Sequence, residues 1–95
     1  MLSEQQIEKR LIKKVKEFGG KALKFISPGL RGVPDRIVLL PGARIYFVEL
    51  KRPGEKLMPQ QEKRRDELIS LGFKHYELDS YEAVEVFINE VCKTQ

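Results

Sequence analysis

The chain has 95 residues, 41% of them hydrophobic, and carries a formal net charge of +4. This length gives one domain, residues 1–95, and excludes a second, while the charge is consistent with a polyanionic partner. Cys92 has no second cysteine for an internal disulfide, and no apolar stretch is long enough to cross a bilayer, so we expect an intracellular protein with no membrane partner.

The first expected element is a helix that begins after Ser3. Ser3 and Gln6 form a capping-box pattern, in which the two side chains satisfy backbone N–H groups at the start of the helix. Apolar residues then recur at helical spacing until Gly19-Gly20 ends the helix. These residues are Ile7, Leu11, Ile12, Val15 and Phe18.

Three strands are expected next. Residues 22–27 form a short strand that Pro28-Gly29 closes, and residues 35–40 form a second after a Gly-Val-Pro turn. Pro41-Gly42 makes a tight connection to residues 44–51, which have the strongest β character of the chain.

The remaining elements are a helix, a strand and a last helix. Pro59 suits the first turn of a helix over residues 59–71, and residues 73–78 form a fourth strand. Asp79 or Ser80 caps the last helix, which runs to about Val91. A three-strand meander followed by a crossover helix predicts an α/β fold with a mixed four-stranded sheet flanked by helices.

The third strand contains charged residues where a sheet normally buries hydrocarbon. Because side chains alternate along a strand, Glu49 and Lys51 share a face with Ile45 and Phe47. An ionised carboxylate in such a strand is costly unless a cation or several donors compensate it. Asp35 begins the preceding strand, and the two carboxylates could converge on a hard divalent cation.

These motifs resemble those of a known nuclease superfamily. Pro34-Asp35, a hairpin-length gap and Glu49-x-Lys51 are similar to the PD-(D/E)xK pattern. The wider motifs resemble the small stand-alone VRR-NUC (virus-type replication-repair nuclease) domains of phages, and the resemblance covers nearly the whole chain. They are Ser27-Pro28-Gly29, Gly32-Val33-Pro34-Asp35-Arg36, Phe47-Val48-Glu49-Leu50-Lys51 and the downstream Gln61.

The resemblance implies a restriction-endonuclease-like core of order αβββαβ plus a C-terminal helix. It also implies an Mg²⁺-dependent endonuclease, with Mn²⁺ able to substitute and no small-molecule cofactor. The implied substrate is DNA, in particular branched DNA such as four-way junctions, and a phage-encoded member would act in the cytoplasm of the host cell. The alternatives are a non-catalytic DNA-binding or regulatory module and a restriction-type sequence-specific nuclease.

The candidate metal ligands are Asp35, Glu49 and, by the resemblance, the Leu50 carbonyl. Lys51 projects to the same side as Glu49, where we expect it to position the nucleophilic water and stabilise charge on the phosphate. The alternative for Lys51 is a strand-end ion pair with Glu49. Gln61 faces inward on the second helix, and the resemblance gives it a place in the site, although packing against a backbone group is an alternative.

The first helix offers a further acid. Glu4 and Glu8 both fall inside the apolar arc, and an acid in the first turn such as Glu4 is favoured by the helix dipole. Glu8 lies one turn deeper and needs an inward partner, either the metal site or a structural Arg or Lys. Superfamily members similarly supply a carboxylate from this helix, and we choose Glu8 over Glu4 while both remain open.

Several cations flank the motif loops and could contact DNA phosphates. They are Lys24, Arg31, Arg36 and Arg52, with Arg44 and Lys56. His75 has no second His or Cys at metal-ligand spacing, so we expect it to be structural, as we expect Cys92 to be.

A homodimer is the expected working unit, since two incisions in a four-way junction suit two-fold symmetry. The resemblance points the same way. Apolar residues cover a wide arc of the last helix, which leaves surface for a partner unless the helix is deeply packed. They are Tyr81, Ala83, Val84, Phe87, Ile88 and Val91.

Overall fold

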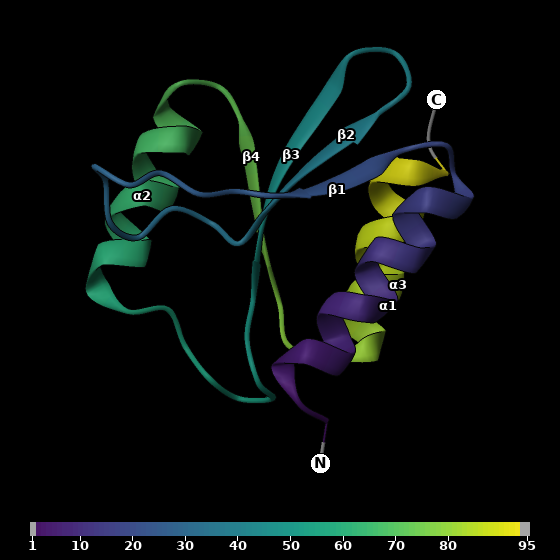
Figure 1. Ribbon diagram of the computed structural model, residues 1–95, viewed down its shortest axis with the longest axis horizontal. Helices are drawn as coiled ribbons and strands as arrows, with labels where there is room; N and C mark the ends of the chain where they lie inside the picture. Colours follow the sequence, from purple (N-terminus) through teal and green to yellow (C-terminus); the bar gives the residue numbers. More distant parts are fainter. Residues whose placement is uncertain (1, 94–95) are drawn as a thin grey trace.

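The computed structural model describes residues 2–93, in which four strands form one mixed sheet (Figure 1). The strands are β1 (Lys21–Lys24), β2 (Arg36–Leu40), β3 (Arg44–Leu50) and β4 (Lys74–Leu78), in the order β1-β2-β3-β4. β1, β2 and β3 form an antiparallel meander, and β4 returns parallel to β3. The predicted α/β class and element order are confirmed.

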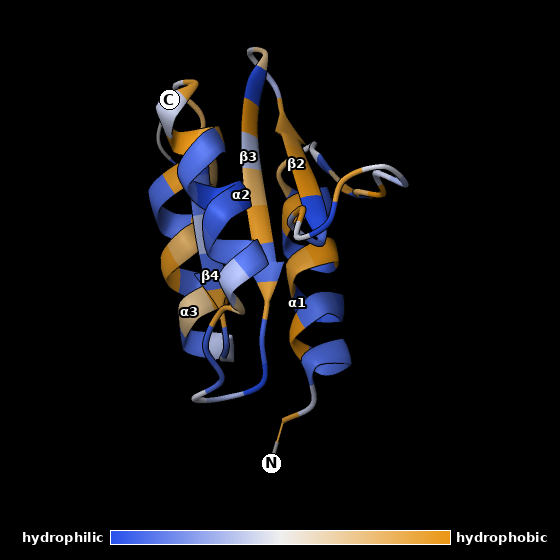
Figure 2. Ribbon diagram, turned by 90° about the vertical axis from the view of Figure 1, so that its left-hand side faces the viewer, coloured by the Kyte–Doolittle hydropathy of each residue, from blue (hydrophilic) through white to orange (hydrophobic). Residues whose placement is uncertain are grey.

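The helices lie on two sides of this sheet. α1 (Glu4–Glu17) packs beside α3 (Tyr81–Phe87), which continues as the short π-helix η1 (Ile88–Cys92). α2 (Pro59–Ser70) lies on the other side, next to β4 (Figure 1). α2 has no buried residue and is almost entirely hydrophilic, whereas β2 and β3 are largely hydrophobic (Figure 2).

The main core lies between the sheet and the layer formed by α1, α3 and η1. Ile7, Leu11 and Val15 of α1 are fully buried, as are Val38 and Val48 of the sheet. Each such side chain stabilises the fold by roughly 1.5–3 kcal/mol relative to an exposed position. Capping supports α1 at its start, since the Ser3 N–H donates to Gln6 Oε1 (2.7 Å) and the Gln6 N–H donates to Ser3 Oγ (3.1 Å), as predicted.

The apolar arc of the last helix belongs to this core. Val84, Phe87, Ile88 and Val91 are at most 3% exposed. The expectation that this arc leaves a surface for a partner is therefore wrong, and the alternative of a deeply packed helix is what the structure has. A wide arc is required here because α3 meets both α1 and β4.

The element boundaries agree with the prediction to within one residue, except at the end of β1. β1 ends at Lys24 rather than at residue 27, because the pairing beyond it is limited to the Phe25 N–H, which donates to the Asp35 carbonyl (2.9 Å), before the turn at Ser27. The last helix reaches Cys92 but winds as a π-helix over its final five residues. Within residues 2–93, no helix combines the length and apolar character that crossing a membrane requires.

Candidate active site

Asp35 and Glu49 face each other across two antiparallel strands. Arg36 is paired with Val48, so one further step of the register sets Asp35 opposite Glu49. The Leu50 N–H donates to Asp35 Oδ2 (2.9 Å), which fixes the Asp35 carboxylate against β3. The structure thus brings together the two carboxylates and the Leu50 backbone, three of the predicted ligand groups.

Glu49 is an acid held in unfavourable surroundings. It is only 3% exposed. Its pKa is raised to about 8, first because burial removes solvent from the carboxylate and then because Asp35 repels its charge, while Lys51 opposes the rise. A carboxylate pair in such a place favours a bound cation.

Gln61 holds one oxygen of this acid. Its Nε2 donates to Glu49 Oε2 (2.9 Å), and its Oε1 accepts the N–H of Met58 (2.8 Å), the residue that precedes α2. Pro59 occupies the first turn and places Gln61 at the third position of the helix, where a side chain can reach back to the start. The amide is therefore oriented by the helix start and directed at Glu49.

Lys51 completes the cluster. Its Nζ lies 3.8 Å from Glu49 Oε2, and the residue is 8% exposed. Its N–H donates to the Leu78 carbonyl (3.0 Å), which keeps the backbone of residue 51 in the sheet. A pocket of about 370 Å³ opens at Lys51, and its lining residues include Glu55, Lys56, Leu57, Glu62, Arg65, Glu77 and Asp79.

The loop that delivers Asp35 is packed against the start of α2. Gly32 has a φ of +84°, and a Cβ on this residue would lie 2.3 Å from the Gln60 carbonyl oxygen. Both the backbone conformation and the close approach require glycine. This contact ties the loop before Asp35 to the helix that carries Gln61.

The two acids of α1 take different places. Glu8 Oε2 accepts a hydrogen bond from Arg36 Nε (2.8 Å), and Arg36 also donates to the Ala22 carbonyl (3.0 Å). Because neighbours in a strand alternate, Arg36 points to the opposite face of the sheet from Asp35, and Glu8 meets it there. The structural-arginine alternative for Glu8 is what the structure has, and Glu8 is not brought to the carboxylate pair.

The charge of Glu4 interacts with those of Asp35 and Glu49. Partial burial raises its pKa, and the charge of Asp35 is the next largest cause. Glu4 also raises the pKa of Glu49. The first turn of α1 therefore supplies the acid that senses Asp35 and Glu49.

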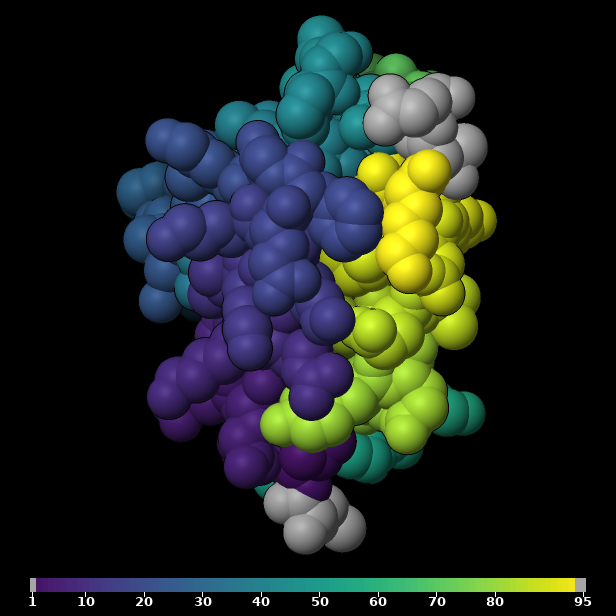
Figure 3. Space-filling model, turned by 90° about the vertical axis from the view of Figure 1, so that its right-hand side faces the viewer, coloured from purple at the N-terminus to yellow at the C-terminus, as the bar shows by residue number. Residues whose placement is uncertain are grey.

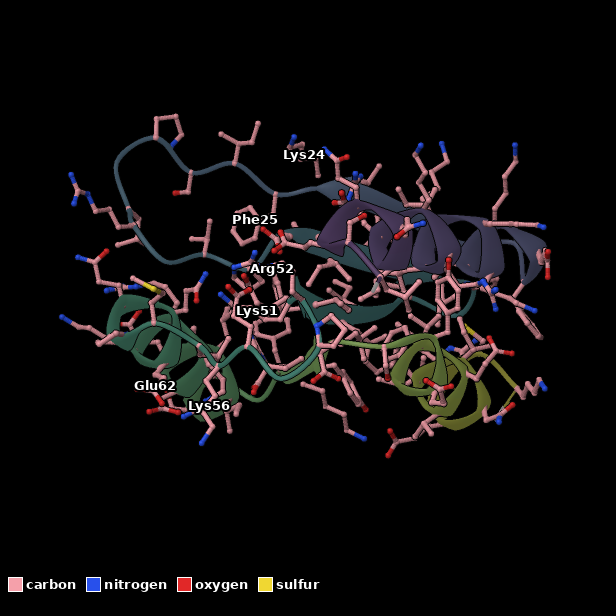
Figure 4. The ribbon with its side chains drawn as sticks, turned by 90° about the horizontal axis from the view of Figure 1, so that it is seen from below. Lys24, Phe25, Lys51, Arg52, Lys56 and Glu62 are labelled. Carbon is pink, nitrogen blue, oxygen red and sulfur yellow. The ribbon has the colours of Figure 1, made fainter. Side chains whose placement is uncertain are left out.

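The predicted DNA-contacting residues are divided in the same way. Arg52 directly follows Lys51, and Figure 4 shows Lys24 and Phe25 on one side of Lys51 and Lys56 and Glu62 on the other. Arg52 is exposed and pairs with Glu55 (3.1 Å), and Arg31 is exposed. Arg36 is committed to Glu8, so its predicted role at phosphates is not supported. Arg44 donates to the Pro41 and Val91 carbonyls, away from the cluster.

Glu77 was not singled out from the sequence. The parallel register places it beside Glu49, and it lines the pocket at Lys51. The sequence places Glu77 and His75 on the same face of β4, but it does not give the register between β3 and β4 that sets Glu77 beside Glu49. His75 itself is buried, which lowers its pKa, and Cys92 is buried, which raises the pKa of its thiol, as suits structural residues.

The donor set fits a hard divalent cation. Among residues 2–93, no group of three or more His, Cys, Asp or Glu side chains is placed to hold a metal ion. The available donors are two facing carboxylates and backbone oxygen, and Mg²⁺ is commonly bound by one or two carboxylates with several waters retained. The cluster therefore matches Mg²⁺ better than a metal that needs nitrogen or sulfur ligands.

The chain is similar to known proteins in sequence and in fold. No protein-family model matches the chain. The chain is 50% identical over 80 residues to "Putative nuclease p44" of Acyrthosiphon pisum secondary endosymbiont phage 1, with 84% of this chain and 86% of that protein covered. Its fold is similar to a solved structure described as a VRR_NUC domain, with a TM-score of 0.88, 27% identity, and 93% of this chain and 96% of that chain covered.

Proposed function

The chain belongs to the VRR-NUC family of nucleases, and from this we propose that it is a metal-dependent endonuclease that hydrolyses phosphodiester bonds in branched DNA. One observation carries the proposal. The buried carboxyl of Glu49 faces Asp35 across the β2–β3 pair and has the Lys51 ammonium 3.8 Å away. Two acids and a lysine so arranged suit the binding and cleavage of a phosphodiester.

Asp35, Glu49 and the Leu50 carbonyl would hold Mg²⁺ or Mn²⁺, with Glu4 better placed than Glu8 to contribute through water. A divalent cation in such a site supplies Lewis-acid stabilisation of the phosphate and makes a water more acidic. Gln61 keeps Glu49 oriented through its amide hydrogen bond (2.9 Å). Asp35 is oriented in turn by the Leu50 N–H.

Lys51 has the role of a charge-stabilising donor. Lys51 lines the pocket, and its ammonium lies next to the Glu49 carboxylate, where it can donate to a non-bridging oxygen of the scissile phosphate. We expect it also to position the attacking water. A donor aimed at charge that develops in the transition state contributes roughly 3–4 kcal/mol.

Branched DNA and a homodimer are part of the same proposal. Two cuts at a four-way junction need two sites, and a two-fold dimer supplies them. The buried arc of α3 and η1 is not available for pairing, so the dimer surface lies elsewhere on the molecule.

The proposal is tested by incubating the protein with a fixed four-way junction, a flap and a linear duplex, each with Mg²⁺ or with EDTA. We expect cleavage of the branched substrates only with the metal. Lys51→Ala should reduce the cleavage rate about a hundredfold or more, with little change in junction affinity. Cleavage in EDTA, or a Lys51→Ala variant that cuts at the parental rate, would contradict the mechanism.

A further inference from the structure

The positive charge of the chain is concentrated in its N-terminal quarter. Residues 1–24, which include α1 and β1, contain seven Lys or Arg and three Asp or Glu. The rest of the chain contains eleven of each. The whole formal net charge of +4 therefore belongs to this segment.

Three of these lysines form a row on the outer side of α1, here named the α1 ridge: Lys9, Lys13 and Lys16. They are exposed and follow the spacing i, i+4, i+7, so they share the face opposite the buried Ile7 and Leu11. Within residues 2–93, none of the three has an ion-pair partner, whereas the neighbouring Lys14 pairs with Glu85 (3.7 Å). The ridge is thus uncompensated positive charge.

A hollow beside the ridge has the character of an anion site. It measures about 230 Å³ between α1 and the start of α3, and Gln6, Lys9, Arg10, Lys13 and Tyr81 line it. The lining carries hydrogen-bond donors and no carboxylate, and the Arg10 guanidinium is held 4.0 Å over the Tyr81 ring. The pocket at Lys51 differs, because its lining includes four acids. Figure 3 shows the face on which α1 and α3 lie side by side.

The ridge is turned away from the active site. At about 100° per residue, Lys9, Lys13 and Lys16 lie roughly 120–180° around α1 from Glu4, the acid whose charge interacts with Asp35 and Glu49. Lys24 belongs to the same N-terminal segment and lies on one side of Lys51 (Figure 4). Lys9 to Lys16 spans about 10 Å along the helix axis, the length of about three base-pair steps of DNA.

We propose that the α1 ridge and its hollow bind the phosphate backbone of a second duplex arm of a branched substrate, an inference that rests on the proposed nuclease function. One arm enters the cleft at Lys51, and the branch directs the other along α1. A straight duplex seated in the cleft does not follow this change of direction. The ridge therefore adds affinity for branched DNA in preference to linear DNA.

The test compares two triple variants with the same change in net charge. Lys9→Gln, Lys13→Gln and Lys16→Gln remove the ridge, and Lys63→Gln, Lys74→Gln and Lys93→Gln remove three exposed lysines elsewhere. Binding of a four-way junction and of a linear duplex is measured in EDTA over a range of salt concentrations. If each ridge lysine neutralises one phosphate, the ridge variant should lower the salt slope for the junction by about 2.7 and weaken binding at ~0.1 M salt by more than tenfold.

The control triple variant and the linear duplex should change much less, and cleavage of saturating junction with Mg²⁺ should keep its parental rate in both variants. The inference would be overturned if the ridge and control variants had the same salt slope for the junction. It would also be overturned if the ridge variant lost as much affinity for the linear duplex as for the junction. Thermal unfolding checks that both variants are folded. The single variant Lys13→Gln tests separately whether the hollow contributes to junction binding. A parent protein that binds the junction through the ridge but cuts no DNA with Mg²⁺ or Mn²⁺ would instead refute the proposed function and leave the binding surface in place.

Discussion

At the scale of single residues, the Glu49 carboxyl is the group whose charge is least well accommodated in the absence of a cation. It is 3% exposed, faces Asp35 and has one cation, Lys51, at 3.8 Å. Because a bound ion relieves the repulsion in the folded state alone, Mg²⁺ or Mn²⁺ should raise the thermal midpoint of the protein. Asp35→Asn and Glu49→Gln should abolish this response, measured by calorimetry with and without each ion.

Glu49→Gln should also stabilise the protein when no metal is present. The new amide keeps an oxygen for Gln61 Nε2, and it removes a carboxyl with a pKa raised to about 8, which must take up a proton at neutral pH or stay charged beside Asp35. A gain of about 1 kcal/mol corresponds to roughly 4–8 °C in a domain of this size. If the variant unfolds at a lower temperature than the parent in EDTA, the pair is stabilised by contacts other than those described.

The acids of α1 give a matched pair one turn apart. Glu8→Gln removes the charge of the acceptor in the partly buried hydrogen bond with Arg36 and should lower the free energy of unfolding by roughly 1 kcal/mol, with cleavage retained. Glu4→Gln should leave stability nearly unchanged and slow cleavage, because Glu4 is coupled to Asp35 and Glu49. Urea unfolding and junction cleavage, measured on both variants, show which acid serves the site. A severe cleavage defect in Glu8→Gln alone would support Glu8, the acid chosen from the sequence.

The partner of Glu8 could not be predicted from the sequence. The helical pattern indicated correctly that Glu8 turns inward, but the direction of a side chain does not name its partner. That partner depends on which strand face lies above α1, and Arg36 rather than Asp35 is on that face. The facing of Asp35 and Glu49 was foreseeable because a hairpin and a period of two determine it.

At the scale of elements, the contact between the Gly32 loop and α2 can be tested with two glycines of similar conformation. Gly32 and Gly54 have φ of +84° and +80°, but a Cβ meets Gln60 backbone only at Gly32. Gly54→Ala should cost about 1 kcal/mol from its left-handed backbone. Gly32→Ala should cost more and should also slow cleavage, since it moves the loop before Asp35 or the turn that carries Gln61. Equal effects of the two changes on cleavage would argue against this coupling.

The order of elements was predictable because each carries local signals. The capping box at Ser3 begins α1, and Pro59 lies in the first turn of α2, as their sequence positions predict. The last helix was harder, since a wide apolar arc describes equally a helix packed on two neighbours and a helix with a free face. The contacts of α3 with both α1 and β4 are tertiary facts that no local pattern contains.

At the scale of the whole molecule, the proposed dimer predicts a particle of twice the 11.0 kDa chain mass. Light scattering over a concentration series checks this. Val86→Glu, at a position 64% exposed on α3, should leave the thermal midpoint nearly unchanged, because the core uses the other side of that helix. A monomer that nevertheless makes paired cuts at a junction would contradict the dimer and leave the single site intact.

Because α2 has no buried residue, we expect it to open more readily than the sheet. Glu49 lies on β3, and Asp35 directly precedes β2, where its carbonyl accepts the Phe25 N–H, but Gln61 lies on a helix with no buried residue. Helices with little buried apolar surface open at low free energy without unfolding the rest of the domain. Backbone amides of α2 should therefore exchange with deuterium well before those of β2 and β3. The Gln61 contact to Glu49 should then form and break during the lifetime of the folded state, so the site alternates between a closed form and one open to incoming DNA.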